Sequence, residues 1–172
     1  SADVTVNATD TTSNAGGPSG ATITVAGTST FTSLALNSSH TLTLKAAGTI
    51  DIGVPVSSNS TGGLNLFTDG AVSAGTITLS GGALTVAGTN GIGTRAGSFT
   101  AGDIDTSGAA TKAGGAVSIS TDGNLSTGTI TPRGGGSGGT GTPGAGGSVV
   151  LRATNGSITT GAIDTRGGSA GN

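Results

Sequence analysis

Apolar and polar side chains alternate in the segment 115–133 (GAVSISTDGNLSTGTITPR), and glycines interrupt the alternation at regular points. The residues that carry the pattern are Val117, Ile119, the tripeptide Thr121-Asp122-Gly123, Leu125, Gly128 and Ile130. Apolar residues at every second position predict short β-strands with one buried face, and the glycine-containing steps predict corners between them. The segment therefore predicts one coil of three short strands.

The same pattern recurs along the chain at a nearly fixed spacing. Five-residue steps join the apolar pairs Val72 and Ile77, Phe99 and Ile104, Leu125 and Ile130, and Ile158 and Ile163. Each step contains a glycine at the same place, and these are Gly75, Gly102, Gly128 and Gly161. A fixed period with a fixed glycine indicates a solenoid, in which stacked coils share one core.

Corner tripeptides of the form Thr-Asp-Gly or Thr-Asn-Gly also repeat. Their second and third residues are Asp69, Gly70, Asn90, Gly91, Asp122, Gly123, Asn155 and Gly156. Asp and Asn side chains can hydrogen-bond their own turn, and glycine tolerates positive φ. We expect these residues to be structural corners for those two reasons.

We expect a single β-solenoid domain over residues 1–172, with weaker repeats in 1–61 and clear repeats in 62–172. Ile23, Leu42, Leu64 and Leu84 lie 19 to 22 residues apart, which predicts coils of about 19–23 residues. Additional residues near 92–96, 106–114 and 132–146 predict insertions, and we expect a row of glycine-rich loops along one edge. Pro55 lacks an N–H donor, so a bend or an interruption of strand pairing is expected beside it.

Composition narrows the classes of function. Of the 172 residues 36 are glycine, aromatic residues make up 2%, and there is no Cys, Met, Trp or Tyr. Helix is disfavoured because Thr, Ser, Gly and β-branched residues dominate. The absence of cysteine removes disulfides and cysteine-ligated zinc, and we expect no cofactor. A net charge of −2 argues against nucleic acid or an anionic membrane surface as a partner. No apolar run approaches the length of a membrane span.

The repeated pattern resembles the repeat region of filamentous haemagglutinin-like exoproteins. The resemblance covers about half of the chain, in segments 62–77, 97–104, 114–133 and 146–166. It implies an all-β, right-handed parallel β-helix exported by two-partner secretion. It also implies a non-enzymatic structural or adhesive shaft of a secreted, extracellular surface protein or fibre. Partners would be flanking repeats of a longer chain, a second copy stacked end to end, or a host or surface glycan.

Few residues are candidates for chemistry. Asp103 and Asp105 flank Ile104 and should project from one outer face, where paired carboxylates could bind Ca²⁺ or serve acid–base catalysis in a polysaccharide-degrading β-helix. The equivalent flanks in other coils are mostly threonine, so we interpret the pair as solvated. His40, the one histidine, is interpreted as a corner residue. The glycines at 134–136 lead into more glycine rather than a helix, so we expect a loop and not a phosphate cradle.

Threonine pairs offer a second kind of candidate site. Thr76, Thr78, Thr129 and Thr131 form T-x-T pairs, and aligned pairs on a flat solenoid face could bind ice or a glycan. Threonine also suits exposed strand positions, and Asp103, Asp105 and Asp164 break the best column. Arg133 and Arg166 occupy the same place in the repeat, where they could end strands or contact an acidic glycan.

Overall fold

The computed structural model of the chain describes residues 4–8, 21–28, 32–89, 91, 94–138 and 141–171. In this part of the chain there are three parallel β-sheets and no helix, so none is long and apolar enough to cross a membrane. Asn90, which the sequence assigns to a corner, lies outside the described residues.

Each sheet takes one strand from each coil. Sheet A contains β1 (Val4–Ala8), β4 (Leu42–Ala46), β7 (Leu64–Thr68), β10 (Leu84–Ala87), β13 (Val117–Thr121) and β16 (Val149–Ala153). Sheet B contains β2 (Ile23–Val25), β5 (Ile50–Ile52), β8 (Ala71–Ala74), β11 (Ser98–Ala101), β14 (Leu125–Ser126) and β17 (Ile158–Thr159). Sheet C contains β3 (Leu34–Leu36), β6 (Val56–Ser58), β9 (Ile77–Leu79), β12 (Ile104–Asp105) and β15 (Ile130–Thr131).

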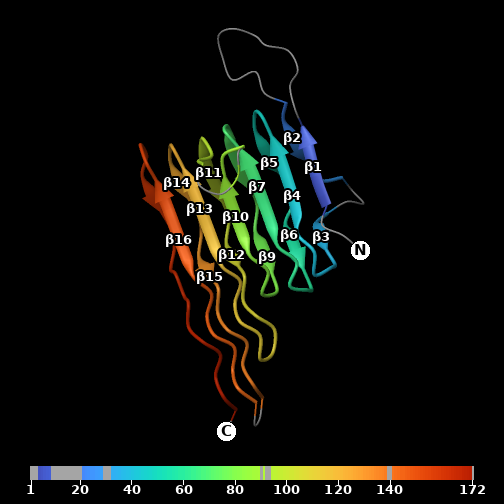
Figure 1. The fold of residues 1–172 in the computed structure, drawn as a ribbon, viewed down its shortest axis with the longest axis vertical. Coiled ribbons are helices and arrows are strands. Elements are labelled where there is room, and N and C mark those ends of the chain that lie inside the picture. The colour runs from blue at the N-terminus through green and yellow to red at the C-terminus, as the bar shows by residue number, and fades with distance from the viewer. Residues whose placement is uncertain are drawn as a thin grey trace.

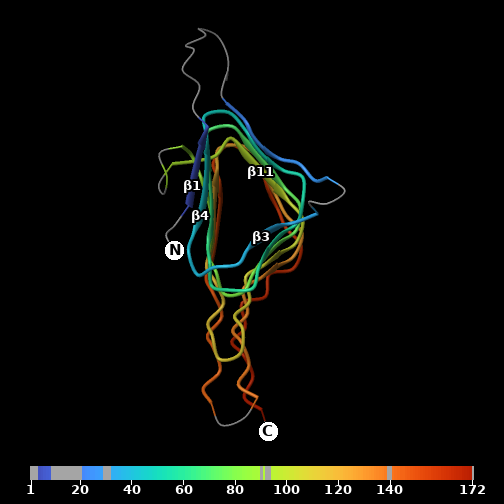
Figure 2. The same cartoon turned by 90° about the vertical axis from the view of Figure 1, so that its right-hand side faces the viewer.

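The chain runs through sheets B, C and A in turn, and every paired strand is parallel to its neighbours in the coils before and after it. The coils lie side by side in Figure 1, and Figure 2 shows them nearly end on as one three-sided outline. The parallel β-solenoid expected from the sequence is confirmed. Its right-handed sense stays a prediction.

The core consists of vertical columns of aliphatic side chains. In sheet A one column holds Leu44, Leu66 and Ile119, each at most 3% exposed. Sheet B contributes Ile50, Val72, Phe99 and Leu125, and sheet C contributes Val56, Ile77, Ile104 and Ile130. Burial of each such side chain contributes about 1.5–3 kcal/mol. The columns, rather than any single pair of strands, stabilise the coil stack.

The five-residue steps and their glycines also align as expected. The N–H of Gly102 donates to the carbonyl of Gly75 over 3.1 Å, and Gly128 donates to Gly102 over 3.1 Å. Gly161 continues the column by donating to Gly128 over 2.9 Å. This glycine column turns the chain from sheet B into sheet C in successive coils.

The expectation that the glycines of the Thr-Asp-Gly and Thr-Asn-Gly corners adopt positive φ is wrong for most of them. Of the corner glycines, Gly91 has positive φ, whereas Gly70, Gly123 and Gly156 do not. Those three glycines stack in one column, and a Cβ on Gly70 would lie 2.0 Å from the oxygen of Gly48. Glycine is required there for close approach between coils and not for a left-handed conformation. Gly91 lies in the insertion, outside this column, and Gly97 takes its place in the stack.

The carboxylates of these corners bond between coils and not within their own turns. Asp69 accepts hydrogen bonds from the N–H and hydroxyl of Thr89 in the next coil, over 2.8 and 2.6 Å. Asp122 accepts one from the amide side chain of Asn155 over 2.8 Å. The bond within the turn comes instead from the buried threonine, since Thr68 Oγ1 accepts from the N–H of Gly70 over 3.0 Å.

The spacing of the first coils differs from the expected one. The 19-residue interval from Ile23 to Leu42 does not measure a coil, because Ile23 pairs with Ile50 in sheet B and Leu42 pairs with Val4 in sheet A. Coils without a long insertion measure 22 residues, from Leu42 to Leu64, and 20 residues, from Leu64 to Leu84. Pro55 lies between β5 and β6, at the bend that the sequence predicts.

Candidate functional site

The predicted site residues lie mainly on the outer face of sheet C. Asp105 is in register with Thr78 in the coil before it and with Thr131 in the coil after it. Asp103 likewise lies between Thr76 and Thr129, since Ile77 donates to the carbonyl of Asp103 and Ile104 to that of Thr129. Sheet C thus brings these six residues into two adjacent columns, of which Asp103 and Asp105 form the middle rung.

The two aspartates face the same side but bind different groups. Asp103 Oδ1 accepts from the backbone N–H of Thr129 over 2.7 Å, and hydrogen bonds from that N–H and the Thr129 hydroxyl lower the pKa of Asp103. Asp105 Oδ1 accepts from the N–H of Ser107 over 2.9 Å. Asp103 is therefore bonded to the next coil, whereas Asp105 is bonded within its own coil. No group of three or more His, Cys, Asp or Glu side chains that could hold a metal ion occurs among the described residues.

The threonine pairs do not form an unbroken array. Thr76, Thr78 and Thr129 are exposed, and Thr131 is half-buried. Asp103 and Asp105 separate the pair at 76 and 78 from the pair at 129 and 131, so threonine pairs never occupy successive coils in these columns. A ligand that binds regularly spaced groups on this face would therefore meet carboxylates, and not threonine hydroxyls, in the middle coil.

One ion-pair cluster lies at the end of the same face. Asp164 binds both Arg133 and Arg166, with the Arg166 Nε 2.9 Å from Oδ1 and the Arg133 Nε 2.6 Å from Oδ2. The hydrogen bonds from Arg166 first, and then those from Arg133, hold the pKa of Asp164 well below its usual range. Asp164 in turn raises the pKa of Arg166. The two arginines do occupy equivalent places in successive coils, and they share one carboxylate there.

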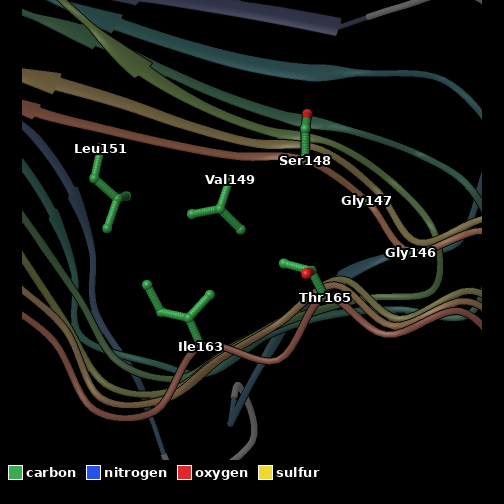
Figure 3. A pocket seen from close by; sticks show the side chains of 7 residues that line it. All are labelled: Gly146, Gly147, Ser148, Val149, Leu151, Ile163 and Thr165. Atoms are coloured by element: carbon green, nitrogen blue, oxygen red, sulfur yellow. The ribbon is translucent and has the colours of Figure 1, made fainter.

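The end of the solenoid next to β16 contains an open hollow of about 670 Å³. Figure 3 shows Val149, Leu151 and Ile163 directed toward one another across it. Val149 and Leu151 continue the columns of Val117 and Ile119, and Ile163 lies in register with Ile130. The hollow is therefore the interior of the solenoid open to solvent, not a pocket built around polar groups.

Three glycine-rich segments project from the corner between sheets C and A. We call them arm 1 (106–116), arm 2 (132–148) and arm 3 (165–171). Each follows the sheet C position of its coil, and arms 1 and 2 return to β13 and β16. In Figures 1 and 2 they extend together from the body as one narrow projection. The expected row of glycine-rich segments at one edge is therefore present.

The arms are bonded to one another at every third residue. Gly108 and Thr111 of arm 1 donate to Arg133 and Gly136 of arm 2 over 2.9 and 3.1 Å. In the same way Gly134 and Ser137 of arm 2 donate to Arg166 and Ser169 of arm 3 over 2.9 and 3.0 Å. The two runs of arm 2 are joined by bonds from Gly144 to Gly135 and from Gly147 to Pro132. A bonding period of three is that of the polyproline II helix, whereas β-strands pair with a period of two. Thr111 departs from that conformation, since it lies in the turn of arm 1 with a φ of 61°.

Glycine is required in this bundle because the backbones are in close contact. A Cβ on Gly135 would lie 1.8 Å from the oxygen of Ala109, and one on Gly144 would lie 1.8 Å from that of Lys112. Gly134 and Gly168 are equally crowded, at 1.9 and 2.0 Å from neighbouring carbonyl oxygens. Collagen uses glycine for the same reason, since only glycine fits where polyproline II chains meet. The arms are therefore a packed element and not loops.

Comparison with protein-family models, with curated proteins and with solved structures finds no match to this chain. Any function proposed for the chain therefore rests on its structure and its sequence. Sequence reasoning missed the packing of the arms and the Asp164 cluster. The signal for the arms was present in the spacing of glycines through 134–147, which suits a three-residue helix better than a turn.

Proposed function

We propose that this chain is a length of a rigid, non-enzymatic structural shaft in an extracellular adhesive or fibrous assembly. The observation that carries the proposal is that core columns continue into the coils at both ends. Val6 pairs in register with Leu44 at one end, and Leu151 pairs with Ile119 at the other. Such columns end in apolar side chains that a further coil would cover.

Exposure of the end coils supports this reading. Val4 is 55% exposed and Val6 45%, although both belong to core columns. At the other end Ile163 is 47% exposed and Ile158 46%. Large aliphatic side chains at both ends, beside unpaired strand edges, favour extension by another coil. Flanking repeats or copies stacked end to end could supply it.

The charged groups favour a structural role over catalysis. Asp103 and Asp105 bind backbone N–H groups, and Asp69 and Asp122 bind side chains of the neighbouring coil. Asp164 is held between two arginines. Apart from Asp105, which bonds within its own coil, each of these carboxylates joins one coil to another, as expected in a shaft. The likeness to filamentous haemagglutinin-like repeats stays a prediction.

Sedimentation velocity and negative-stain imaging over a range of concentrations test the shaft. We expect particles that lengthen along the solenoid axis at constant width. Val6→Lys at one end and Ile163→Lys at the other should prevent lengthening, because each places a charge on an apolar end surface. Thr100→Lys, on the exposed face of sheet B, is the matched control and should lengthen normally. Particles of fixed length at the highest attainable concentration, or equal behaviour of all three variants, contradict the proposal in this form.

A ligand-binding solenoid is the second candidate, because Thr76 and Thr78 are exposed on either side of Ile77. An ice-recrystallisation assay and a glycan array test it directly. Binding that is lost in Thr78→Lys but retained in Thr100→Lys would favour this candidate over the shaft. A polysaccharide-degrading enzyme would instead show activity that Asp103→Asn or Asp105→Asn abolishes.

A further inference from the structure

The arm bundle has an open flank on the side of arm 3. Two N–H groups of arm 1 donate to arm 2, and the two equivalent N–H groups of arm 2 donate to arm 3. Gly135 and Gly168 donate in the opposite direction, to Lys112 and Gly144 of the preceding arm. The donors of arm 2 toward arm 3 are the N–H groups of Gly134 and Ser137. Because Ile130 is in register with Ile163, the equivalent residues of arm 3 are Gly167 and Ala170.

These two N–H groups have no hydrogen bond to any residue that the structure describes. Both residues are exposed. Arm 3 already receives bonds from arm 2 at the carbonyls of Arg166 and Ser169, so its inner side is occupied. Its outer side therefore presents donors at every third residue, in the pattern that the rest of the bundle uses for pairing.

From this pattern we infer that the outer flank of arm 3 is a docking surface for another glycine-rich polyproline II segment. The occupant is the arm of a further coil of this repeat type, and the inference rests on the proposed shaft. Its carbonyl groups would accept from Gly167 and Ala170, as Arg166 and Ser169 accept from arm 2. The bundle thereby continues an interface that two pairs of arms already form.

The first coil of a second copy cannot fill this role. At the corner between sheets C and A, residues 37–41, 59–63 and 80–83 make short connections, and arms begin only at residue 106. A copy stacked by its first coil would cover β16 and β17 but would leave Gly167 and Ala170 unpaired. The edges of β16 and β17 can therefore pair with the first coil of a second copy. The outer flank of arm 3, in contrast, requires a coil that carries an arm.

The test adds one coil to the chain. A copy of residues 139–171 follows Gly171 in place of Asn172, which supplies the return run of arm 3, new core strands and a new arm. Amide hydrogen exchange is then measured by NMR in the original 172 residues and in the extended chain. We expect the amides of Gly167 and Ala170 to exchange at least about tenfold more slowly in the extended chain. The amides of β16 and β17 report separately whether the new coil stacks.

Two variants of the added copy separate arm docking from coil stacking. Gly168→Ala in the copy alone should remove the protection of Gly167 and Ala170, because a Cβ on Gly168 lies 2.0 Å from the facing carbonyl oxygen in the existing bundle. Gly167→Ala in the copy alone is the matched control, since its Cβ has no contact closer than 3.4 Å, and it should keep the protection.

The outcomes are distinct. Protection of β16 and β17 without protection of Gly167 and Ala170 would overturn the docking surface while leaving the shaft intact. Equal protection in the Gly168→Ala copy would also overturn it, because the arm would then not be the cause. Protection of the two amides in the unmodified chain as its concentration rises would assign the flank to a second copy, and would overturn the requirement for an added arm. Failure of β16 and β17 to become protected would count against the shaft itself.

Discussion

The glycines of this protein are required for different reasons. The backbone conformation and the surroundings of each glycine show which reason applies. Gly81 and Gly91 have positive φ, which other residues rarely adopt. Gly135 and Gly144 do not, yet a side chain at either would overlap a neighbouring carbonyl oxygen. Gly138 has neither constraint, since nothing lies within 4 Å of its added Cβ. The count of 36 glycines therefore includes both obligatory and replaceable positions.

Two alanine substitutions in arm 2 test this distinction. Gly135→Ala should lower the free energy of unfolding by about 1–3 kcal/mol, because a rigid backbone must move to admit the methyl group. Gly138→Ala should leave it within about 0.5 kcal/mol or raise it slightly, since alanine restricts the unfolded chain. Urea unfolding followed by circular dichroism measures both. Equal effects would mean that the arms are not packed as described.

Asp164 should make stability depend on pH in a defined direction. Its folded-state pKa is lowered from 3.8, so it stabilises the folded chain above that value, and the contribution is lost as pH falls through the lower folded-state pKa. Asp164→Asn should therefore lower the melting temperature at pH 7, and the difference from the unmodified chain should shrink as pH falls below 3.8 and disappear only below the folded-state pKa. Added salt should reduce the difference, because both arginines are partly exposed. Asp51→Asn, an exposed carboxylate on sheet B, is the control.

Among the elements, the short strands derive their stability from the columns they share. Strands such as β12 and β15 contain only two residues, too few to be stable as an isolated pair. Each contributes one fully buried isoleucine, Ile104 or Ile130, to a column that continues through several coils. The elements are stable because they are stacked.

Truncation of one column residue should affect the whole stack. Ile104→Ala removes a side chain that is 0% exposed between Ile77 and Ile130, and should cost about 2–5 kcal/mol. Thr100→Ala, an exposed position of β11, should change stability by less than about 0.5 kcal/mol. Thermal unfolding of the two variants gives the comparison. Similar melting temperatures would contradict a core made of these columns.

Much of the element arrangement could be predicted because it depends on period and on side-chain type. The step from Leu125 to Ile130 with Gly128 between them specifies two strands and one corner, and the two preceding coils contain the same step in register with it. The role of Gly135 could not be predicted, because it depends on how closely Ala109 approaches from another arm. The pairing of Asp164 with Arg133 depends equally on contacts between residues 31 positions apart. The local sequence pattern thus predicts the strands and corners of each coil. The packing of the arms and the ion pairs of Asp164 depend on contacts between coils, which the local pattern does not contain.

At the scale of the whole molecule, the solenoid is asymmetric. One end presents Val4 and Val6 with a short connection between sheets C and A, and the other presents Leu151, Ile163 and the arm bundle. Assembly along the axis would therefore have a direction, because the two ends offer different surfaces to a partner. The proposed shaft thus has a defined polarity from coil to coil.

The ligand-binding alternative can be tested at this scale, because an ice-binding face requires regular order over several coils. Asp103 and Asp105 interrupt that order in the middle of sheet C. We therefore expect no inhibition of ice recrystallisation by the chain. The double variant Asp103→Thr with Asp105→Thr should create three successive T-x-T pairs, and it is the informative comparison. Inhibition by the unmodified chain would contradict the structural shaft.

The bonds between coils run along the length of the rod, and this has a mechanical consequence. A pull applied to the two termini would peel coils away one at a time, with each backbone bond loaded in turn. Coils from β11 onward are held by the arms as well as by their strands, so they carry load through two parallel sets of links. Rupture should begin among the armless coils near β1 and stall where arm 1 begins, which makes the molecule a rod with a weak half and a reinforced half.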